Sequence, residues 1–424
     1  MDLICEKSTL RGAVNIPGSK SHTIRAVAVA ALAGGESVIR QPLESRDAAA
    51  CVAVYRAFGA DLELTPDVWR VQGLHGEPRT PENVIDVGNS GTSLRIAMGS
   101  AALLRSGMAV LTGDQQIRRR PGGPLAGALT ELGARVRSTR GNGCAPFVVE
   151  GRLRGGRTAI EAVTSQYLSS LLLAAPLADG DTEIEVTLLN EAPYVVMTLD
   201  WLEREGIVLE RDGLQWFRVP GGQRYPAFDR RIPGDFSSAT FFLAAGALEG
   251  NNVLSRGLDL TDVQGDKAVL DYLRAMGAEI SEEDEGVRVR AKALKGTELD
   301  LNATPDALPM MAVLGCFAEG TTRLVNVPQA RLKETDRIAV MRQELTKLGA
   351  QIEELADGLV VHQSRLHGGE VDGQDDHRVV MALAVGATRI SELVRIRGYE
   401  AAAVTYPGFA EELMRLGGAA RIAE

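Results

Sequence analysis

Apolar stretches of similar length recur along the chain, each opened by small polar residues. Six of them end near Leu32, Leu103, Leu177, Leu248, Phe317 and Gly386. Six further stretches have a helical pattern and end at Gly59, Gly133, Gly206, Gly277, Gly349 and Gly417. The copies are spaced by about 70 residues, far more than the repeats of solenoid proteins. The pattern therefore predicts six copies of one small folded unit.

Each copy reads as strand, helix, strand, helix, with further strand material before the next copy. In the first copy, residues 19–21 open a helical run from Ile24 to Leu32. A second helix is expected from Asp47 to Phe58, followed by an alternating strand at 61–64. The fourth copy repeats this order, with one helix opened by residues 235–238 and a second from Asp266 to Met276. Helices mixed with parallel and antiparallel strand material predict an α/β fold.

The six copies divide into two sets of three. The pairs Pro17–Gly18 and Pro233–Gly234 are the expected crossings between the sets. Residues 18–233 then form an N-terminal lobe, and residues 1–17 with 234–424 form a C-terminal lobe. The N-terminal strand is expected to complete the last copy of the second lobe. A ligand site is expected in the cleft between the lobes, where such sites are common.

Composition narrows the class of protein. The chain has 424 residues and a net charge of −10, which argues against nucleic acid as a partner. No apolar run approaches the ~18 residues that a membrane span needs, and no secretory signal is recognisable. The four cysteines are widely spaced, which disfavours a disulfide scaffold and a zinc site. A cytoplasmic location is expected.

Basic side chains stand at or beside the openings of several stretches, against the sign of the net charge. They are Lys20, Arg25, Arg95, Arg120, Lys333, Arg337 and Arg378. Helix N-termini already favour anions, through their free N–H groups and the helix dipole. Cations gathered at such positions predict a site for a strongly anionic ligand.

Five short segments carry these cations: IPGSKSHTIR, DVGNSGTSLR, DQQIRRRP, RLKETDR and DDHR. Each segment alone is equally compatible with a helix cap or a solvated ion pair. The first is not a Walker A loop, because Ala13 stands where that loop has its first glycine. Glu334, held among cations, can exchange protons if desolvation offsets their pull on its pKa. Because at least four segments fall at matching places of a repeat, together they predict one site.

In this order and spacing, the segments PGSKS…R, GNSGT…R, RRRP, TSQY, PDA, KETDR and DDHR resemble the 5-enolpyruvylshikimate-3-phosphate synthase family, from Gly12 to Phe409. The resemblance implies a two-domain inside-out α/β barrel in which each domain is a threefold repeat of a βαβαββ unit. It also implies transfer of the enolpyruvyl group of phosphoenolpyruvate to the 5-hydroxyl of shikimate 3-phosphate, with release of phosphate, in the biosynthesis of chorismate and aromatic amino acids. No metal or organic cofactor is implied, and a monomer is expected.

The resemblance further implies roles for individual residues. Asp306 would take the proton of the acceptor hydroxyl, Glu334 would protonate the methylene carbon and later take a proton back, and Lys20 would touch both substrates. The acceptor would be bound by Lys20, Ser21, Arg25, Thr164, Ser165, Gln166, Asp306, Gln329 and Lys333. Phosphoenolpyruvate would be bound by Lys20, Gly91, Thr92, Arg120, Gln166, Arg337 and Arg378. Two multiply charged anions account for so many cations in an acidic protein.

Three positions depart from the family's pattern. Glu191 stands where the family usually has a serine that helps to bind the acceptor phosphate, and a carboxylate there would repel a phosphate. Val404 replaces a lysine on the phosphoenolpyruvate side of the site, and Gln116 replaces a basic residue before RRRP. A paralogous enolpyruvyl transferase that acts on a different hydroxyl acceptor is therefore an alternative.

Other classes fit less well. The enolpyruvyl transferase of cell-wall synthesis carries a cysteine in the loop near RRRP, and that loop has none here. RNA 3′-phosphate cyclase has a similar repeat unit but needs a nucleotidylated histidine and must bind RNA, which the negative charge disfavours. A non-catalytic anion-binding protein is disfavoured because Glu334 and Asp306 are both present.

Overall fold

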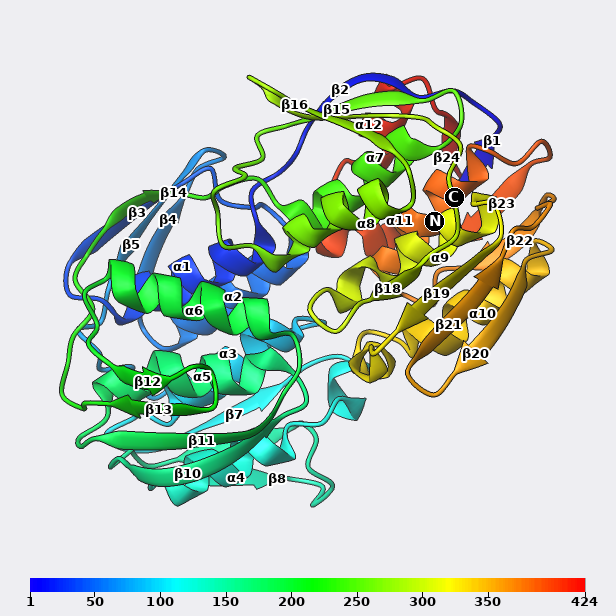
Figure 1. Ribbon diagram of the computed structural model, residues 1–424. Coiled ribbons are helices and arrows are strands. Elements are labelled where there is room, and N and C mark those ends of the chain that lie inside the picture. Colours follow the sequence, from blue (N-terminus) through cyan, green and yellow to red (C-terminus); the bar gives the residue numbers. More distant parts are fainter. Residues whose placement is uncertain (424) are drawn as a thin grey trace. The chain divides into compact units, whose positions relative to one another are not determined.

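The structure is a computed structural model that describes residues 1–423 (Figure 1). The chain folds into two compact units, one of Lys20–Ile232 and the other of Met1–Ser19 with the residues from Pro233 onward. The chain leaves and re-enters the second of these units at the two proline-glycine pairs. There Gly18 and Gly234 form a β-bridge, and the Ser19 N–H donates to the Pro233 carbonyl oxygen at 2.8 Å.

The unit of residues 20–232 contains three four-stranded sheets. Its strands are β3 (Glu36–Arg40), β4 (Asp61–Leu64), β5 (Val68–Gln72), β6 (Ile85–Asp86), β7 (Met108–Thr112), β8 (Arg135–Ser138), β9 (Phe147–Glu150), β10 (Gly156–Ala162), β11 (Thr182–Leu189), β12 (Glu210–Asp212), β13 (Trp216–Val219) and β14 (Asp229–Arg231). Its helices are α1 (Lys20–Leu32), α2 (Arg46–Ala57), α3 (Gly91–Ala101), α4 (Gly123–Glu131), α5 (Ser165–Ala174) and α6 (Ala192–Arg204), with short 3-10 helices at Ile117–Arg119 and Ala175–Leu177.

The other unit also contains three four-stranded sheets. Its strands are β1 (Asp2–Glu6), β2 (Arg11–Asn15), β15 (Asn252–Arg256), β16 (Glu279–Glu283), β17 (Gly286–Arg290), β18 (Glu298–Asp300), β19 (Thr321–Val325), β20 (Gln351–Leu355), β21 (Gly358–His362), β22 (Gly369–Asp372), β23 (Val394–Arg397) and β24 (Ala419–Ala423). Its helices are α7 (Phe236–Ala247), α8 (Val269–Ala275), α9 (Leu308–Phe317), α10 (Arg337–Lys347), α11 (His377–Ala387) and α12 (Phe409–Arg415). Short 3-10 helices lie at Gly265–Ala268, Pro305–Ala307, Pro328–Leu332 and Tyr399–Val404.

All six sheets share one arrangement. The first strand in each order given below is parallel to the second, and the two remaining pairs of neighbouring strands are antiparallel. In the unit of residues 20–232 the orders are β14-β3-β5-β4, β6-β7-β9-β8 and β10-β11-β13-β12. In the other unit they are β2-β15-β17-β16, β18-β19-β21-β20 and β22-β23-β1-β24. The N-terminal strand lies where the sequence predicts it, because Leu3 of β1 pairs with Ile396 of β23 and Ile422 of β24.

Helices α2, α4, α6, α8, α10 and α12 each end two residues before one of the predicted glycines. All six glycines have a positive φ, for example 71° at Gly206, which a residue without a Cβ adopts at little cost. The predicted first residues of two helices are wrong. Helix α2 begins at Arg46 because Ser45 caps it, and the helix expected from Asp266 is a 3-10 turn followed by α8.

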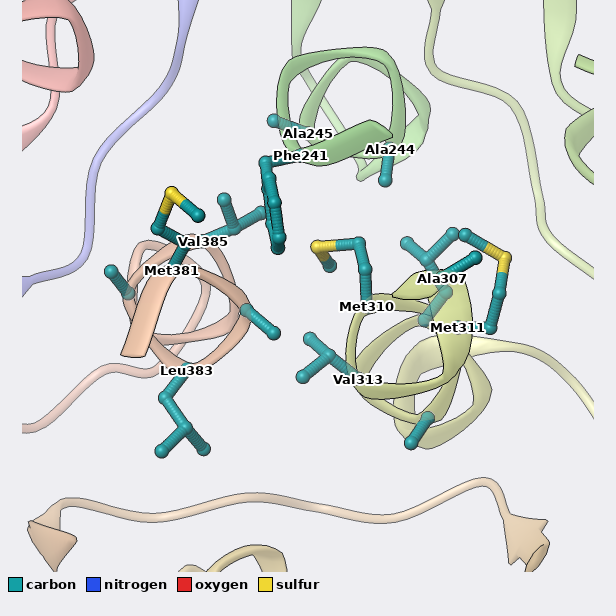
Figure 2. Packing of buried hydrophobic residues seen from close by; sticks show 14 of the residues in the cluster. Phe241, Ala244, Ala245, Ala307, Met310, Met311, Val313, Met381, Leu383 and Val385 are labelled. Carbon is teal, nitrogen blue, oxygen red and sulfur yellow. The ribbon is translucent and has the colours of Figure 1, made fainter. Parts of the chain in front are cut away.

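The almost wholly apolar stretches form helices that are buried on every side. Every residue of α3, α7 and α11 is buried. Figure 2 shows Phe241 of α7, Met310 of α9 and Val385 of α11 directed into the space among their three helices. Each large apolar side chain buried in this way contributes about 1.5–3 kcal/mol to folding. Among the described residues, none of the helices combines the length and apolar character that a membrane span requires.

Candidate active site

Two arginine side chains approach each other beside Gly91, at the start of α3. A Cβ on Gly91 would lie 2.5 Å from Arg95 Nη1 and 2.6 Å from Arg120 Nη1. Arg95 Nη1 donates to Gln166 Oε1 at 3.0 Å, and Gln166 Nε2 donates to Thr92 Oγ1 at 3.1 Å. Burial lowers the pKa of Arg95, and the positive charge of Arg120 lowers it further. Two buried guanidiniums so close together form a place where an anion is stabilised.

Lys20 opens α1 and faces a carboxylate that the sequence did not single out. Its Nζ lies 3.4 Å from Asp47 Oδ2, in the first turn of α2. The Ser93 hydroxyl of α3 donates to the Asp47 carbonyl oxygen at 3.4 Å. The starts of α1, α2 and α3 are therefore connected. Asp47 orients the Lys20 ammonium and balances its charge.

Arg25 is 2% exposed, and protein groups accept most of its N–H bonds. Its Nε donates to Thr198 Oγ1 at 2.9 Å and its Nη2 to the Tyr194 carbonyl oxygen at 2.9 Å. Its Nη1 donates to the Ser21 carbonyl oxygen at 3.0 Å. Burial lowers the pKa of Arg25 to about 10. Arg25 thus ties α1 to α6, and only a small part of its hydrogen-bonding capacity remains for a ligand.

The Glu191 carboxylate binds the start of α5. Its Oε2 accepts hydrogen bonds from Thr164 Oγ1 at 3.0 Å, from Ser165 Oγ at 2.8 Å and from the Ser165 N–H at 3.2 Å. The residue is 1% exposed, and its φ of 59° places it in the left-handed region. The hydroxyls that the resemblance assigns to the acceptor phosphate therefore already hold a negative charge.

Arg337, the first residue of α10, is surrounded by three carboxylates. Its Nη1 donates to Asp306 Oδ1 at 2.6 Å, its Nη2 to Glu334 Oε2 at 2.7 Å and its Nε to Asp376 Oδ2 at 2.8 Å. Burial lowers the pKa of Arg337, but the charges of Asp376, Glu334 and Asp306 hold that pKa well above its usual value. Arg337 is therefore a permanent cation that fixes the positions of all three acids.

Arg378 connects the starts of three helices. Its Nη2 lies 3.1 Å from Asp306 Oδ2, its Nη1 donates to the Ser237 carbonyl oxygen of α7 at 3.0 Å, and its N–H donates to Asp376 Oδ1 at 2.8 Å. The Arg337 and Arg378 side chains are each 1% exposed, whereas the Asp306 side chain is 15% exposed and the Glu334 side chain 10%. The two acids therefore reach the surface of the cluster, with the arginines behind them.

The remaining predicted residues of this unit lie just before α10. Gln329 is buried, its Nε2 donates to the Asn302 carbonyl oxygen at 2.8 Å, and its Oε1 has no hydrogen-bond partner within residues 1–423. Lys333 is half-buried at the end of the 3-10 helix that contains Gln329. Val404, where the family has a lysine, is buried.

The predicted residues fall into two groups, one in each unit. The unit of residues 20–232 holds Lys20, Ser21, Arg25, Gly91, Thr92, Arg120, Thr164, Ser165 and Gln166. The other unit holds Asp306, Gln329, Lys333, Glu334, Arg337 and Arg378. Within residues 1–423, no group of three or more His, Cys, Asp or Glu side chains is arranged to hold a metal ion.

Comparisons with known proteins give one family. A family model described as EPSP synthase (3-phosphoshikimate 1-carboxyvinyltransferase) matches residues 4–413. A 3-phosphoshikimate 1-carboxyvinyltransferase of Ruminiclostridium cellulolyticum is 54% identical over 418 residues, with 99% of each chain covered. A protein of the same name from Acetivibrio thermocellus is 53% identical over 417 residues, with 98% of each chain covered.

Solved structures give the same result. An EPSP synthase from Acinetobacter baumannii matches with a TM-score of 0.84 and 26% identity, covering 100% of both chains. The predicted two-domain α/β fold and the predicted family are both confirmed. The chain belongs to the EPSP synthase (3-phosphoshikimate 1-carboxyvinyltransferase) family.

Proposed function

We propose that the chain is a 3-phosphoshikimate 1-carboxyvinyltransferase, which moves the enolpyruvyl group of phosphoenolpyruvate to the 5-hydroxyl of shikimate 3-phosphate and releases phosphate. The reaction is a step in the biosynthesis of chorismate and aromatic amino acids. One observation carries the proposal: Asp306 and Glu334 share the buried Arg337 guanidinium, at 2.6 and 2.7 Å. This arrangement supplies two positioned proton-transfer groups beside a fixed positive charge.

The arginines are assigned to phosphoenolpyruvate. Arg120, Arg337 and Arg378 would neutralise its phosphate and carboxylate, groups that guanidiniums favour. Arg337 would act mainly through its charge, because its N–H groups already donate to carboxylates of the protein. Gly91 and Thr92 would lie against the donor, because the missing Cβ of Gly91 leaves the approach to Arg120 open. Gln166 would contact both substrates, and Lys20 would sit between them.

Two carboxylates are assigned to the proton transfers. Asp306 takes the proton of the acceptor hydroxyl while the hydroxyl oxygen forms a bond to C2 of phosphoenolpyruvate. At the same time Glu334 gives a proton to C3. The bond between C2 and the phosphate oxygen then breaks, and Glu334 takes a proton back from C3, which restores the double bond. The proton held by Asp306 leaves with the phosphate, so both carboxylates return to their starting state. Arg337 holds both acids throughout, and Arg378 holds the second oxygen of Asp306 at 3.1 Å. Each proton-transfer group is expected to contribute about 10²–10⁴-fold to the rate.

The acceptor is assigned to the remaining residues. Ser21 and Arg25 would hold the ring and its carboxylate, and Thr164, Ser165 and Lys333 would hold its phosphate. Gln329 is assigned to the acceptor because its buried Oε1 lacks a partner among the described residues. A buried acceptor atom left unsatisfied costs about 1–3 kcal/mol, which a ligand hydroxyl would recover. We propose that the groups of both units act on one substrate pair in a cleft between them.

Phosphate release tests the reaction directly. With phosphoenolpyruvate and shikimate 3-phosphate, we expect saturable release, matched by an equal amount of enolpyruvyl ether in the proton NMR spectrum. Release only with another hydroxyl acceptor would contradict the acceptor and favour the paralogous transferase. If the protein binds anions but releases no phosphate with any acceptor, the proposed catalytic activity is contradicted.

We also propose that the enzyme is a cytoplasmic monomer that needs neither metal nor organic cofactor. Light scattering should give the mass of one chain at micromolar concentration. Activity should persist after exhaustive dialysis against a chelator. A dimer mass would contradict the first statement, and activity restored only by added metal would contradict the second.

A further inference from the structure

A cavity of about 400 Å³ lies in the unit of residues 20–232, beside the loop that precedes α4. It is lined by Gln115, Arg118, Arg119, Arg140, Asn142 and Cys144. None of these residues has a role in the proposed reaction. Three of the six lining side chains are guanidiniums, so the cavity is strongly basic in a protein whose net charge is −10.

Among residues 1–423, no carboxylate pairs with these guanidiniums. Within the described residues, none of Arg118, Arg119 and Arg140 forms an ion pair, in contrast to other exposed arginines such as Arg135, which pairs with Glu150 at 3.4 Å. Residues 115–144 contain six arginines and one glutamate, a net charge of +5. Like charges brought together without a counter-charge repel one another, unless an anion joins them.

The nearest acid along the chain is occupied elsewhere. Asp114 Oδ2 accepts a hydrogen bond from Asn89 Nδ2 at 2.6 Å, and its Oδ1 accepts one from the Ile117 N–H at 2.9 Å. Asp114 therefore stabilises its own turn, and within residues 1–423 it forms no ion pair with the three guanidiniums.

The two loops that carry the arginines are held together by backbone and side-chain contacts. Pro121 and Cys144 form a β-bridge between the loops. The Arg118 guanidinium donates to the Gly113 carbonyl oxygen, and Arg140 Nη1 donates to the Arg118 carbonyl oxygen at 3.5 Å. These contacts already order the two loops. A ligand that binds there therefore costs the protein less conformational entropy, which favours binding.

We propose that this cavity is an auxiliary anion-binding site that takes small phosphorylated molecules. Three guanidiniums can share the several oxygens of a phosphate, and the amide groups of Gln115 and Asn142 add uncharged donors. The volume falls within the range of about 300–1,000 Å³ that small-molecule sites occupy. Arg119 directly precedes Arg120, so the site would raise the local concentration of phosphorylated substrate beside the arginine assigned to phosphoenolpyruvate. Anion binding here does not depend on the proposed reaction.

Cys144 provides a reporter within the cavity itself. Cys144 is among the lining residues and is partly exposed, whereas Cys5, Cys51 and Cys316 are buried. Alkylation of the full-length protein by anionic iodoacetate and by neutral iodoacetamide is compared, each rate being divided by the rate with free cysteine. We expect a relative preference for iodoacetate of at least about tenfold, as local positive charge concentrates anions. Inorganic pyrophosphate should protect the thiol saturably, at concentrations where chloride of equal ionic strength does not. Peptide mass mapping confirms the modified residue.

A double variant and a matched control decide the outcome. The Arg118→Gln/Arg140→Gln protein should lose both the iodoacetate preference and the pyrophosphate protection. The Arg137→Gln protein, changed at an exposed arginine of β8 outside the cavity, should keep both. An unchanged preference in the double variant, or the absence of protection in the unmodified protein, would overturn the proposal.

Turnover separates this inference from the proposed reaction. In the double variant, kcat should be unchanged, whereas kcat/KM for phosphoenolpyruvate should fall about threefold at low salt and match the unmodified protein at high salt, where charges are screened. Normal turnover without pyrophosphate protection would reject the auxiliary site alone. Protection without turnover would reject the proposed reaction alone.

Discussion

Glu334 and Asp306 share one guanidinium, yet they are proposed to move different protons. Glu334→Gln keeps the size of the side chain and an oxygen for Arg337, but it cannot transfer a proton. We expect kcat to fall about 10²–10⁴-fold, with KM for phosphoenolpyruvate changed much less. Steady-state kinetics measure both constants. Glu298→Gln is the control, since Glu298 pairs with Arg323 at 3.0 Å on the exposed surface of the same unit. Near-normal turnover of Glu334→Gln would contradict the assigned role.

Glu191 is a carboxylate at the position proposed for the acceptor phosphate. Two negative charges about 4 Å apart repel by roughly 1–4 kcal/mol per charge pair, depending on screening. Glu191→Ser should therefore bind shikimate 3-phosphate at least about tenfold more tightly, near 1.4 kcal/mol, in a calorimetric titration. Glu191→Gln separates charge from shape, because it retains the side-chain length and should give a similar gain. Unchanged affinity in both variants would mean that the Glu191 carboxylate does not weaken the binding of shikimate 3-phosphate, and it would contradict the prediction.

Sequence reasoning found most of the charged candidates but not their partners. Asp47 lies 27 residues from Lys20, and Asp376 lies 39 residues from Arg337. Locally, both acids look like ordinary residues of a helix start, and Asp376 indeed caps α11. Their contacts with the cations depend on how the copies pack, which no local pattern encodes. The Glu191 carboxylate is likewise buried, at a residue with a left-handed backbone, and no local pattern predicts either feature.

Helix ends were easier to predict than helix starts. A glycine with positive φ follows the end of each of the six even-numbered helices, because few other residues adopt that conformation. Starts rest on weaker signals. The sequence pattern does not separate α8 from the 3-10 turn at Gly265–Ala268, because a 3-10 turn commonly precedes the first α-helical turn.

The two glycines Gly206 and Gly127 test the backbone requirement. A Cβ on either meets nothing within 4 Å, but Gly206 has a φ of 71° and Gly127 lies inside α4. Gly206→Ala should destabilise the protein by about 1–2 kcal/mol, the cost of a left-handed conformation with a Cβ. Gly127→Ala should stabilise it by about 0.5–1 kcal/mol through helix propensity. Urea unfolding measures both changes in the free energy of unfolding, and both glycines lie in the unit of residues 20–232. Shifts of the same sign would contradict the argument.

Alkaline pH should weaken the molecule through its buried thiols. Burial raises the pKa of Cys5 and of Cys316 to about 12, and it raises the pKa of Cys51 as well. Unfolded thiols ionise near pH 8.5, so from there upward the unfolded chain holds fewer protons than the folded one. The contribution of each buried thiol to the free energy of unfolding is therefore fully present below this pH. It is lost as the pH rises towards the pKa of the folded thiol, by about 1.4 kcal/mol per pH unit for each thiol.

Urea unfolding at pH values from 8 to 10 measures this slope before most tyrosines ionise. Cys316→Ala lowers stability at every pH but should reduce the slope by the share of one thiol. An unchanged slope would show that other groups cause the loss.

The substrate pair should draw the two units together, if groups from both act on it. Small-angle scattering should give a smaller radius of gyration with shikimate 3-phosphate and an unreactive donor analogue than without them. Arg120→Gln, which weakens donor binding, should require more analogue for the same change. An unchanged radius at saturation would contradict a shared site.

Strand β1 pairs with strands that are synthesised at the other end of the chain, Cys5 lying opposite Val394. At about 5–20 residues per second, a ribosome makes the β23 partner roughly 20–80 seconds after β1. The three sheets of residues 20–232 need no strand from outside that range, so this unit can finish folding during synthesis. Strand β1 is thus made long before the strands that pair with it. Until then its edges remain open to other chains, and any truncation before β23 makes that exposure permanent.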